Sequence, residues 1–392
     1  MMDRNDKAAF VLGRGVVSAI GTGVEATRGN IRAGVVAVPA LPKKISTQLK
    51  LPVFEVEGFG ECADMPGGRC TAMLKTAIDE ALAESGIAPE ELKSLRVGVA
   101  MGTTVSCQLN NVPFYAALRK GESPSAEPLR SYVEGNPAEW VRREYALQGP
   151  VLTVSNACAS GTDAIGIAML WLRAGIVDIA IAGGTDEINK VPYDGFFALG
   201  VCSDEPCRPF DAGRKGLNLG EAAAAVVLGG EKFRETAKFA LTGFGKTADA
   251  FHITRPAPDG AGLEAAIRNA LADAGTVPGD IDYINAHGTG TDTNDRTESA
   301  VLGRVFGPEV KFSSTKAMTG HTLGAAGALE CVLSLIALED SVIPGNLRFS
   351  CLAADMPVAP VADTTPLPGM RRALSVSVAF GGSNSAVVME RI

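Results

Sequence analysis

Short runs of mostly apolar residues alternate along this chain with longer segments of helical periodicity. Residues 151–155, VLTVS, form one apolar run, and GTDAIGIAMLWLRAG at 161–175 has the length and period of a helix. Amphipathic helices are also predicted at 76–87 and 265–276, each with a glycine near its end. Apolar strands that alternate with helices are buried on both faces, so the pattern predicts an α/β protein whose sheets are covered by helices.

The pattern occurs twice, in the same order. The matched segments are 10–18 with 240–248, 76–87 with 265–276, 95–104 with 281–291, 152–161 with 311–320, and 219–229 with 380–390. We therefore interpret the chain as two related α/β halves, residues 1–235 and 236–392. Residues 104–150 have no counterpart in the second half, and we interpret them as an inserted cap. Ligands of such sheets bind at the carboxyl ends of the strands. We call the turn that follows each strand end a corner, and we expect the functional residues at these corners.

Composition narrows the class of protein. The net charge of −8 argues against nucleic acid as the main partner. No run of about 18 uninterrupted apolar residues occurs, and the N-terminus lacks the apolar core of a signal peptide, so we expect a cytoplasmic protein with no membrane partner. The eight cysteines form no CxxC pair and show no disulfide-like spacing.

Cys158 lies at the first of these corners. The strand ends at Ser155 and the helix follows directly, so this thiol lies at or near a helix N-terminus, where the free N–H groups and the helix dipole favour a thiolate. Its own backbone N–H is also placed to face a developing oxyanion. The alternative is an ordinary packed core cysteine, the commoner role of this residue type.

The second half supplies chemistry at equivalent corners. The chain has three histidines, and two of them, His287 in NAHGTGT and His321 in STKAMTGHTLG, end matched segments. Lys316 lies at the same turn as His321, where its charge would keep nearby imidazoles neutral. Glu330, on the helix that follows, would hold Lys316. A purely structural role for Lys316 and Glu330, as a buried ion pair, is an equally weighted alternative.

A thiol with two histidines fits one reaction type well. The thiol takes up an acyl group as a thioester. Two neutral imidazoles then donate hydrogen bonds to the enolate of a second thioester as its carboxylate leaves as CO₂. This route to a carbanion requires no metal and no organic cofactor.

The motifs SNACASG, NAHGTGTDTND, STKAMTGHTLGAAGALE and VAFGGSNSAVV resemble those of the β-ketoacyl-acyl carrier protein synthases of the type I/II elongating class. The resemblance covers nearly the whole chain. It implies a thiolase fold, with duplicated βαβαβαββ halves in a five-layered αβαβα arrangement. It also implies acyl carrier protein as partner, substrates carried on its phosphopantetheine, and a homodimer or a heterodimer with a related subunit.

Roles follow from the same resemblance. It implies that Cys158 is the nucleophile, that His287 and His321 support decarboxylation and condensation, and that Lys316 is the active-site lysine. The backbone N–H of Phe380 is implied to complete the oxyanion hole, and its ring to gate the acyl pocket. Thr289 and Thr291 resemble the threonines that bind the phosphopantetheine amides.

The chain departs from the family pattern around the acyl pocket. GLNLGEAAA at 216–224 replaces a more usual aromatic and GEGAG pattern, and Val378-Ala379 stands where Phe-Gly is common. These departures bear on acyl chain length and substrate and leave the reaction unchanged. The segment LNLGEAAA resembles the corresponding segment of condensing enzymes from aryl-polyene and related specialised pathways.

Several cations are candidates for carrier contacts. An acidic carrier needs a positive landing surface, and the candidates are Arg208, Arg214, Lys215 and Arg69. Solvated surface charge is the alternative for all four. The segment FHITRPAPDGAG at 251–262 resembles the family's entrance segment, with Thr254 followed by Arg255. A guanidinium can grip a phosphate bidentately, so we predict that Arg255 contacts the phosphopantetheine phosphate.

Three other functions account for part of the pattern. A thiolase would use one histidine and a second, C-terminal cysteine, and AFGGSNS contains none. A non-catalytic partner subunit, such as a chain-length factor, would lack the nucleophile that Cys158 provides. A cysteine hydrolase would leave His321, Lys316 and the duplication unexplained.

Overall fold

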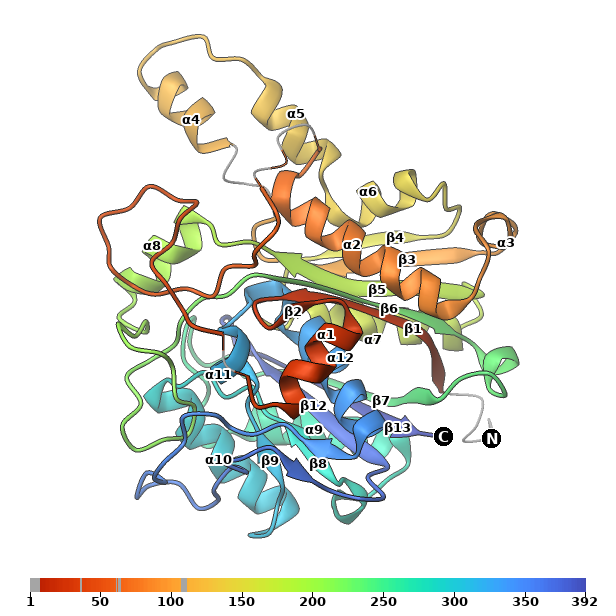
Figure 1. Cartoon of the computed structure of the whole chain (residues 1–392), viewed down its shortest axis with the longest axis vertical. Coiled ribbons are helices and arrows are strands. Elements are labelled where there is room, and N and C mark those ends of the chain that lie inside the picture. Colours follow the sequence, from red (N-terminus) through yellow and green to blue (C-terminus); the bar gives the residue numbers. More distant parts are fainter. Residues whose placement is uncertain (1–7, 36, 61, 63–64, 107–110) are drawn as a thin grey trace.

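The computed structural model describes residues 8–35, 37–60, 62, 65–106 and 111–392. Its main sheet has 11 strands (Figure 1). The first-half strands are β1 (Ala9–Ser18), β2 (Gly21–Thr22), β3 (Val97–Gly102), β4 (Val151–Val154), β5 (Ile179–Asp186) and β6 (Ala222–Gly229). The second-half strands are β7 (Phe239–Ala248), β8 (Tyr283–Asn285), β9 (Phe312–Ser313), β12 (Arg372–Val378) and β13 (Ser383–Arg391). A separate two-stranded sheet pairs β10 (Val342–Ile343) with β11 (Thr365–Pro366).

The strand order repeats between the two halves. The first half reads β4-β3-β5-β6-β1 from its edge, and the second reads β9-β8-β12-β13-β7. If the strands of each half are numbered in chain order, leaving out the short β2, both read 3-2-4-5-1. The halves join where β1 pairs antiparallel with β7. The corners that the sequence matched are therefore equivalent positions of two similar sheets, one in each half, which the short β1–β7 pairing joins into one.

Helices cover these sheets and separate them. The longer helices are α1 (Val24–Arg32), α2 (Gly68–Ser85), α7 (Ser160–Arg173), α9 (Ala261–Ala274), α10 (Asp292–Phe306) and α12 (Ala326–Asp340). The shorter ones are α3 (Pro89–Ser94), α4 (Val112–Arg119), α5 (Glu127–Glu134), α6 (Pro137–Glu144), α8 (Lys190–Ala198) and α11 (Lys316–Thr319). Helix α2 packs on β1 and β6, and α9 packs on β7 and β13. Helices α7 and α12 lie between the halves, which completes the expected αβαβα layering (Figure 1).

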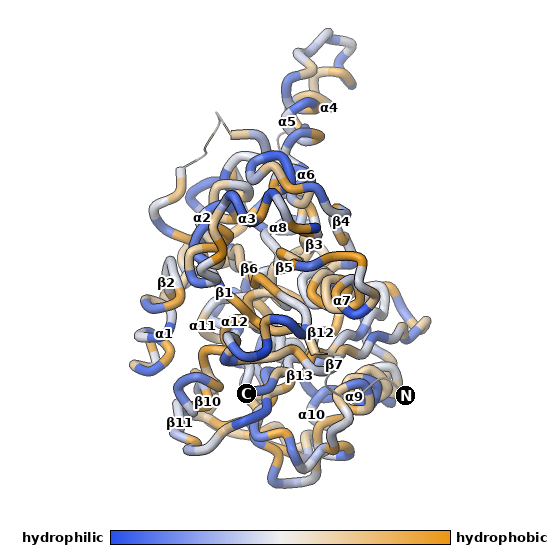
Figure 2. Tube along the Cα trace, turned by 90° about the vertical axis from the view of Figure 1, so that its right-hand side faces the viewer, coloured by the Kyte–Doolittle hydropathy of each residue, from blue (hydrophilic) through white to orange (hydrophobic). Residues whose placement is uncertain are grey.

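The central layer explains why α12 is largely apolar on all sides. Every residue of α12 from Ala326 to Leu338 is buried, as a helix enclosed between two sheets requires. Figure 2 shows the hydrophobic residues concentrated in this centre. Close packing of α7 on α12 depends on Gly161, because a Cβ there would lie 2.6 Å from the backbone nitrogen of Ala328. The first turn of α7, which follows Cys158, is thus held rigidly in the core.

The segment that we interpreted as an inserted cap, residues 104–150, is largely helical where the structure describes it. Residues 107–110 lie outside the described part, and 111–150 form α4, α5 and α6. Helix α6 packs on β3 and β4, whereas α4 and α5 bury no residue and project from the body (Figures 1 and 2). None of the described residues of this segment lines the pocket that holds Cys158. The segment therefore does not cover the pocket of its own chain.

Candidate active site

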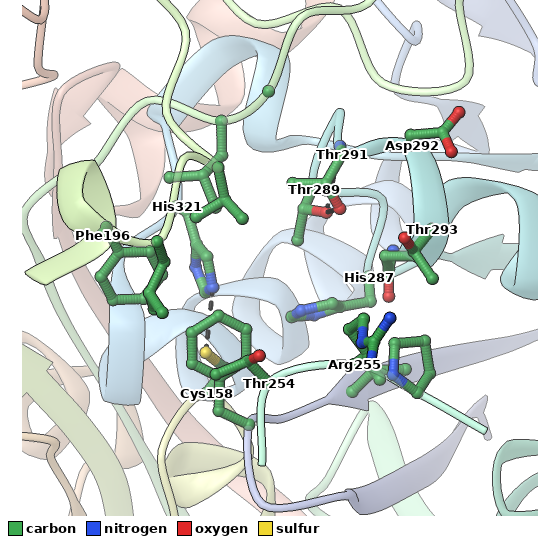
Figure 3. Close-up of a pocket in the computed structure, with 18 of the residues that line it drawn as sticks. Cys158, Phe196, Thr254, Arg255, His287, Thr289, Thr291, Asp292, Thr293 and His321 are labelled. Carbon is green, nitrogen blue, oxygen red and sulfur yellow. Dashed lines mark hydrogen bonds between the residues drawn. The ribbon is translucent and has the colours of Figure 1, made fainter. Parts of the chain in front are cut away.

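Cys158, His287 and His321 meet at the bottom of one pocket of about 380 Å³ (Figure 3). Cys158 comes from the turn between β4 and α7, His287 from the turn after β8, and His321 from the turn after α11. The sulfur of Cys158 and one ring nitrogen of each histidine all lie within 4.8 Å of one another, and the three side chains are buried. The sequence predicted these corners correctly, and the structure brings them together.

The backbone around Cys158 is a sharp elbow. Ala157 has a φ of 46°, a left-handed conformation that costs an alanine about 1–2 kcal/mol. The elbow turns Cys158 into the pocket two residues before α7 begins at Ser160. The backbone N–H of Phe380 donates to the sulfur of Cys158. Two backbone N–H groups from separate segments, those of Cys158 and Phe380, therefore lie beside the nucleophile.

Burial decides the resting state of this thiol. Desolvation raises the pKa of Cys158 to about 12, although the charge of Lys316 and the N–H of Phe380 lower it. The pKa of the thiol is raised because the cost of burying the charge outweighs these favourable effects, so the resting group is the neutral thiol. The same donors stabilise a thiolate that forms transiently when an acyl group is exchanged.

Lys316 holds His287 and sets its tautomer. Its Nζ lies 2.6 Å from the carbonyl oxygen of His287 and 3.3 Å from His287 Nδ1, and it pairs with Glu330. An ammonium has no acceptor, so Nδ1 of His287 must accept and the ring proton lies on Nε2. The Lys316–Glu330 ion pair is buried, and its lysine also contacts an active-site imidazole, so the pair is not isolated from the site.

His321 presents its proton in the same way. The backbone N–H of Leu323 donates to His321 Nδ1 at 3.3 Å, which leaves Nε2 protonated, 3.0 Å from Cys158 Sγ. The two imidazole rings lie edge to face with centroids 5.3 Å apart. The pocket therefore has two Nε2–H donors aimed beside one thiol.

Both imidazoles are neutral. Burial lowers the pKa of His287 and of His321 well below 6.5, and the charge of Lys316 lowers both further. Lys316 acts in the direction that the sequence predicted, although burial is the larger cause. A divalent metal at these three ligands would have to displace the thiol proton and both Nε2 protons beside a lysine, so the arrangement suits hydrogen-bond donation to an oxyanion better than metal binding.

Neutral imidazoles predict a flat pH profile for any step that needs only their N–H groups. We expect CO₂ release from a malonyl thioester to be constant from about pH 8 down to about pH 5.5, because neither ring gains a proton in that window. The measurement is kcat for CO₂ release against pH. A decline with a midpoint near pH 6.5 would contradict the assigned neutrality.

Three residues of this site escaped the sequence reasoning. Glu298, on α10, accepts the backbone N–H groups of His287 and Gly288 at 2.6 and 2.8 Å, and burial raises its pKa to about 7. Asp186, at the end of β5, accepts from the backbone of Gly324 at 2.7 Å and so fixes the turn after His321. Phe196 stacks on Phe380 with centroids 5.3 Å apart.

Sequence carried only weak signals of these three. Asp186 ends a run of apolar strand residues, where a carboxylate is out of pattern, and this position marks a strand's carboxyl end. Glu298 and Phe196 stand in ordinary helical surroundings, so only the fold shows what they contact.

The candidate phosphopantetheine residues line the same pocket, with Thr289 and Thr291 above His287 and with Thr254 and Arg255 below it in the view of Figure 3. Thr289 and Thr291 share a hydrogen bond of 2.8 Å between their hydroxyl oxygens, and Thr254 lies across the pocket from them. Arg255 lines the same pocket, is exposed, and has no ion-pair partner among the described residues.

The candidate landing surface is smaller than the sequence predicted. Arg69 is buried, 4% exposed, and paired with Glu221, so its assignment to the surface was wrong. Arg214 lines the pocket, but its side chain is 5% exposed and bonded to Asp292, which makes it part of the pocket wall. Arg208 and Lys215 are the two that keep surface exposure.

These observations match what comparison with known proteins finds. Residues 66–233 match the model of the beta-ketoacyl synthase N-terminal domain, and residues 239–350 match that of the C-terminal domain. The chain belongs to the beta-ketoacyl synthase family. Residues 216–224 and 378–379 differ from the usual family pattern, and three of these residues line the pocket: Gly216, Leu217 and Ala379.

Relatives of this ketosynthase align over nearly its full length. Nodulation protein E of Rhizobium leguminosarum bv. trifolii is 32% identical, over 99% of this chain and 100% of the relative. The 3-oxoacyl-[acyl-carrier-protein] synthase 2 of Coxiella burnetii is 32% identical, over 98% of this chain and 99% of the relative. A ketosynthase solved in complex with its chain length factor, from Xenorhabdus doucetiae, superposes with a TM-score of 0.87 at 31% identity, over 98% of each chain.

These relatives confirm the thiolase-type fold and the resemblance on which it was predicted. In the described part of the chain, no helix has the length and apolar character needed to cross a bilayer.

Proposed function

We propose that this ketosynthase catalyses decarboxylative Claisen condensation of an acyl-acyl carrier protein with malonyl-acyl carrier protein, releasing CO₂ and 3-oxoacyl-acyl carrier protein. The observation that carries the proposal is the convergence of one buried thiol with two neutral Nε2–H donors in one pocket. One group takes up the acyl chain, and the others stabilise an enolate. The carrier's phosphopantetheine delivers both substrates, and the reaction requires no further cofactor.

The first half-reaction loads the enzyme. Cys158 Sγ attacks the carbonyl carbon of the acyl-carrier thioester, and the oxygen that gains negative charge accepts from the N–H groups of Cys158 and Phe380. The carbon–sulfur bond to the carrier then breaks, and the carrier sulfur leaves with the proton that Cys158 gives up. Acyl-Cys158 and the free carrier thiol are the products.

The second half-reaction forms the new carbon–carbon bond. The malonyl carboxylate leaves as CO₂, and its bonding electrons form an enolate whose oxygen accepts from His287 and His321 Nε2–H. The enolate carbon attacks the acyl-Cys158 carbonyl, and the same backbone N–H groups hold the oxyanion. Collapse releases the 3-oxoacyl chain on the carrier and the Cys158 thiolate, which takes a proton from solvent.

One assay tests this proposal directly. The purified protein is incubated with malonyl-carrier and a panel of acyl-carriers, and the products are identified by mass. A 3-oxoacyl-carrier longer by two carbons than the acyl donor is expected. Absence of any such product, with CO₂ release also absent, would sink the proposal. A thiolase reaction is disfavoured because, in the described chain, Cys158 is the one thiol that lines the pocket.

Among the described cations that line the pocket, Arg255 is the one without an ion-pair partner, and we propose that it binds the phosphopantetheine phosphate. Arg255→Ala should raise KM for acyl-carrier about five- to tenfold and leave kcat nearly unchanged, because an exposed charge-assisted hydrogen bond contributes about 1–1.5 kcal/mol. The readout is steady-state kinetics with acyl-carrier beside an acyl-pantetheine thioester without the phosphate.

The phosphate-free substrate is the internal control. The Arg255→Ala change should leave its KM unaltered, and an equal rise with both substrates would remove the claim. Arg208→Glu and Lys215→Glu serve as companion variants, since we propose that these two exposed cations meet the acidic carrier itself. Their effect should weaken with added salt.

We propose assembly with a second ketosynthase-like subunit along the free edge of the sheet. Strand β4 ends the strand order, and its Leu152 is 41% exposed. Unpaired edges pair readily with another strand. The projecting helices α4 and α5 add exposed Tyr115, Leu118 and Val133. The similar Xenorhabdus ketosynthase is solved with its chain length factor, which supports such a partner.

A charge at the strand edge tests this assembly. Leu152→Lys replaces an exposed apolar side chain of the edge strand with a charged one, which disfavours pairing with another strand. We expect a shift from dimer to monomer in sedimentation or light scattering, with the far-ultraviolet circular dichroism retained. Leu152→Val, which keeps the apolar strand character, is the matched control and should stay dimeric. A wild-type chain that is monomeric alone and with related subunits would contradict the proposal.

A further inference from the structure

The two backbone donors of the oxyanion hole come from segments far apart in the sequence. One belongs to the elbow at Asn156–Cys158, and the other to Phe380 in the turn between β12 and β13. That turn is closed by hydrogen bonds from the Ala379 N–H to the Ser383 carbonyl at 2.8 Å and from the Gly382 N–H to the Ala379 carbonyl at 3.0 Å. Hydrogen bonds within each segment fix its own shape, but they do not fix the position of one segment relative to the other.

Asn156 connects the two segments directly. Its Nδ2 donates to Ser383 Oγ at 2.8 Å, across 227 positions of sequence, and to Asp163 Oδ2 at 2.5 Å. An amide nitrogen carries two hydrogens, so both are used. The backbone N–H of Asn156 donates to Ser160 Oγ at 2.8 Å, which braces the elbow from the helix side.

Asp163 is the anchor for this link. It is 1% exposed, lies in the first turn of α7, and accepts from Ser385 Oγ at 2.5 Å as well as from Asn156. Lys246 on β7 reaches the same carboxylate from the surface, where its side chain is 46% exposed. Lys246 and Ser385 are directly paired across β7 and β13. The carboxylate thus ties α7 and the elbow to both central strands of the second half.

None of these side chains lines the pocket, yet Asn156 belongs to one segment that carries an oxyanion donor and bonds to Ser383 beside the other, and Asp163 bonds to Asn156. We infer that Asn156 and Asp163 are positioning residues that keep the Cys158 and Phe380 N–H groups in register for the carbonyl oxygen of the substrate. This inference rests on the proposed function and names how the same site is held. Displacement of a reacting group by about 1 Å costs rate by about a hundredfold, so a link of this kind has a large effect.

Two reactions of Cys158 distinguish a displaced oxyanion hole from a general loss of structure around the thiol. Acylation by acyl-carrier develops an oxyanion, whereas alkylation by iodoacetamide displaces iodide at a saturated carbon and develops none. Asn156→Ala should therefore lower the acylation rate about tenfold or more, with KM for acyl-carrier unchanged and alkylation within about twofold of wild type. Equal losses in both reactions would show a merely structural role and overturn the inference.

Asp163→Asn should behave like Asn156→Ala, because an amide cannot accept all the bonds that the carboxylate accepts. Lys246→Met is the matched control, since it removes the exposed partner of Asp163 and leaves the bonds from Asn156 and Ser385 in place. It should acylate at nearly the wild-type rate. An acylation-to-alkylation ratio that stays at the wild-type value in Asn156→Ala and Asp163→Asn would contradict the inference.

Asn156→Asp supplies a second measurement should either variant fold poorly. It sets two carboxyl groups side by side, and one of them holds a proton at low pH. Its acylation rate, relative to alkylation, should therefore fall as pH rises, while that of the wild type does not. A pH-independent ratio equal to the wild-type ratio would count against the positioning role. A wild-type protein that is alkylated at Cys158 but accepts no acyl group from any carrier would overturn the proposed function together with this inference.

Discussion

Replacement of Cys158 by alanine is expected to abolish acyl transfer and condensation while malonyl-carrier still loses CO₂. The thiol forms the acyl-enzyme, whereas the enolate is stabilised by His287 and His321 on the facing wall of the pocket. Cys158→Gln should release CO₂ faster than Cys158→Ala, because its amide mimics an acyl group and excludes water from the pocket.

Radiolabelled CO₂ release beside the mass of the intact protein makes this measurement. Wild type gains an acyl group, and neither variant should. A Cys158→Ala protein that still forms acyl-enzyme at the wild-type rate would show that another cysteine is the nucleophile. Cys331→Ala is a suitable control, since that thiol is buried in α12 and lies outside the pocket.

Loss of either active-site imidazole is expected to depress CO₂ release about 10²-fold or more. That is the usual scale for removal of one preorganised oxyanion donor, and each ring contributes one Nε2–H. His287→Ala and His321→Ala should therefore have similar effects on decarboxylation when both are measured in the Cys158→Gln background. There, acyl transfer cannot obscure the result.

The two histidines should differ in the other half-reaction. His321 Nε2 lies 3.0 Å from Cys158 Sγ, so His321→Ala should also slow acyl-enzyme formation, which His287→Ala should affect less. His252 is exposed and does not line the pocket, and His252→Ala is the control. CO₂ release at the wild-type rate in either active-site variant would contradict the assigned role of that imidazole.

Local pattern was enough to predict the architecture. Matched apolar runs and glycine-terminated helices predicted two similar halves, and Gly86 and Gly275 end α2 and α9 with left-handed φ values of 66° and 62°. Such signals act over a few residues, so they survive without knowledge of the fold. They also located Cys158, His287 and His321, because functional groups gather at the ends of strands.

The direction in which one charged residue shifts the pKa of a neighbour was also predictable from sequence. Lys316 is five residues before His321, and its effect on both imidazoles was predicted from that turn. The resemblance to β-ketoacyl synthases rested on the same local motifs, and the family comparison confirms it.

Tertiary structure alone decided which polar groups meet, within each half and between the halves. Arg69 pairs with Glu221, 152 positions away, and is buried by that contact instead of facing a carrier. Asn156 meets Ser383 across 227 positions, and Glu298 supports the turn of His287 from another helix. No periodicity encodes such pairings, because they arise when strands from distant parts of the chain are brought into register.

Burial was the other quantity that only the fold determined. The helix N-terminus near Cys158 was correctly placed from sequence, but the pKa of the thiol rises to about 12 because the surrounding layers remove water from it. The sequence by itself thus determined which groups are present and at which corners they lie. Their protonation states and mutual orientation follow from desolvation and long-range hydrogen bonds, which exist only once the two halves are packed together.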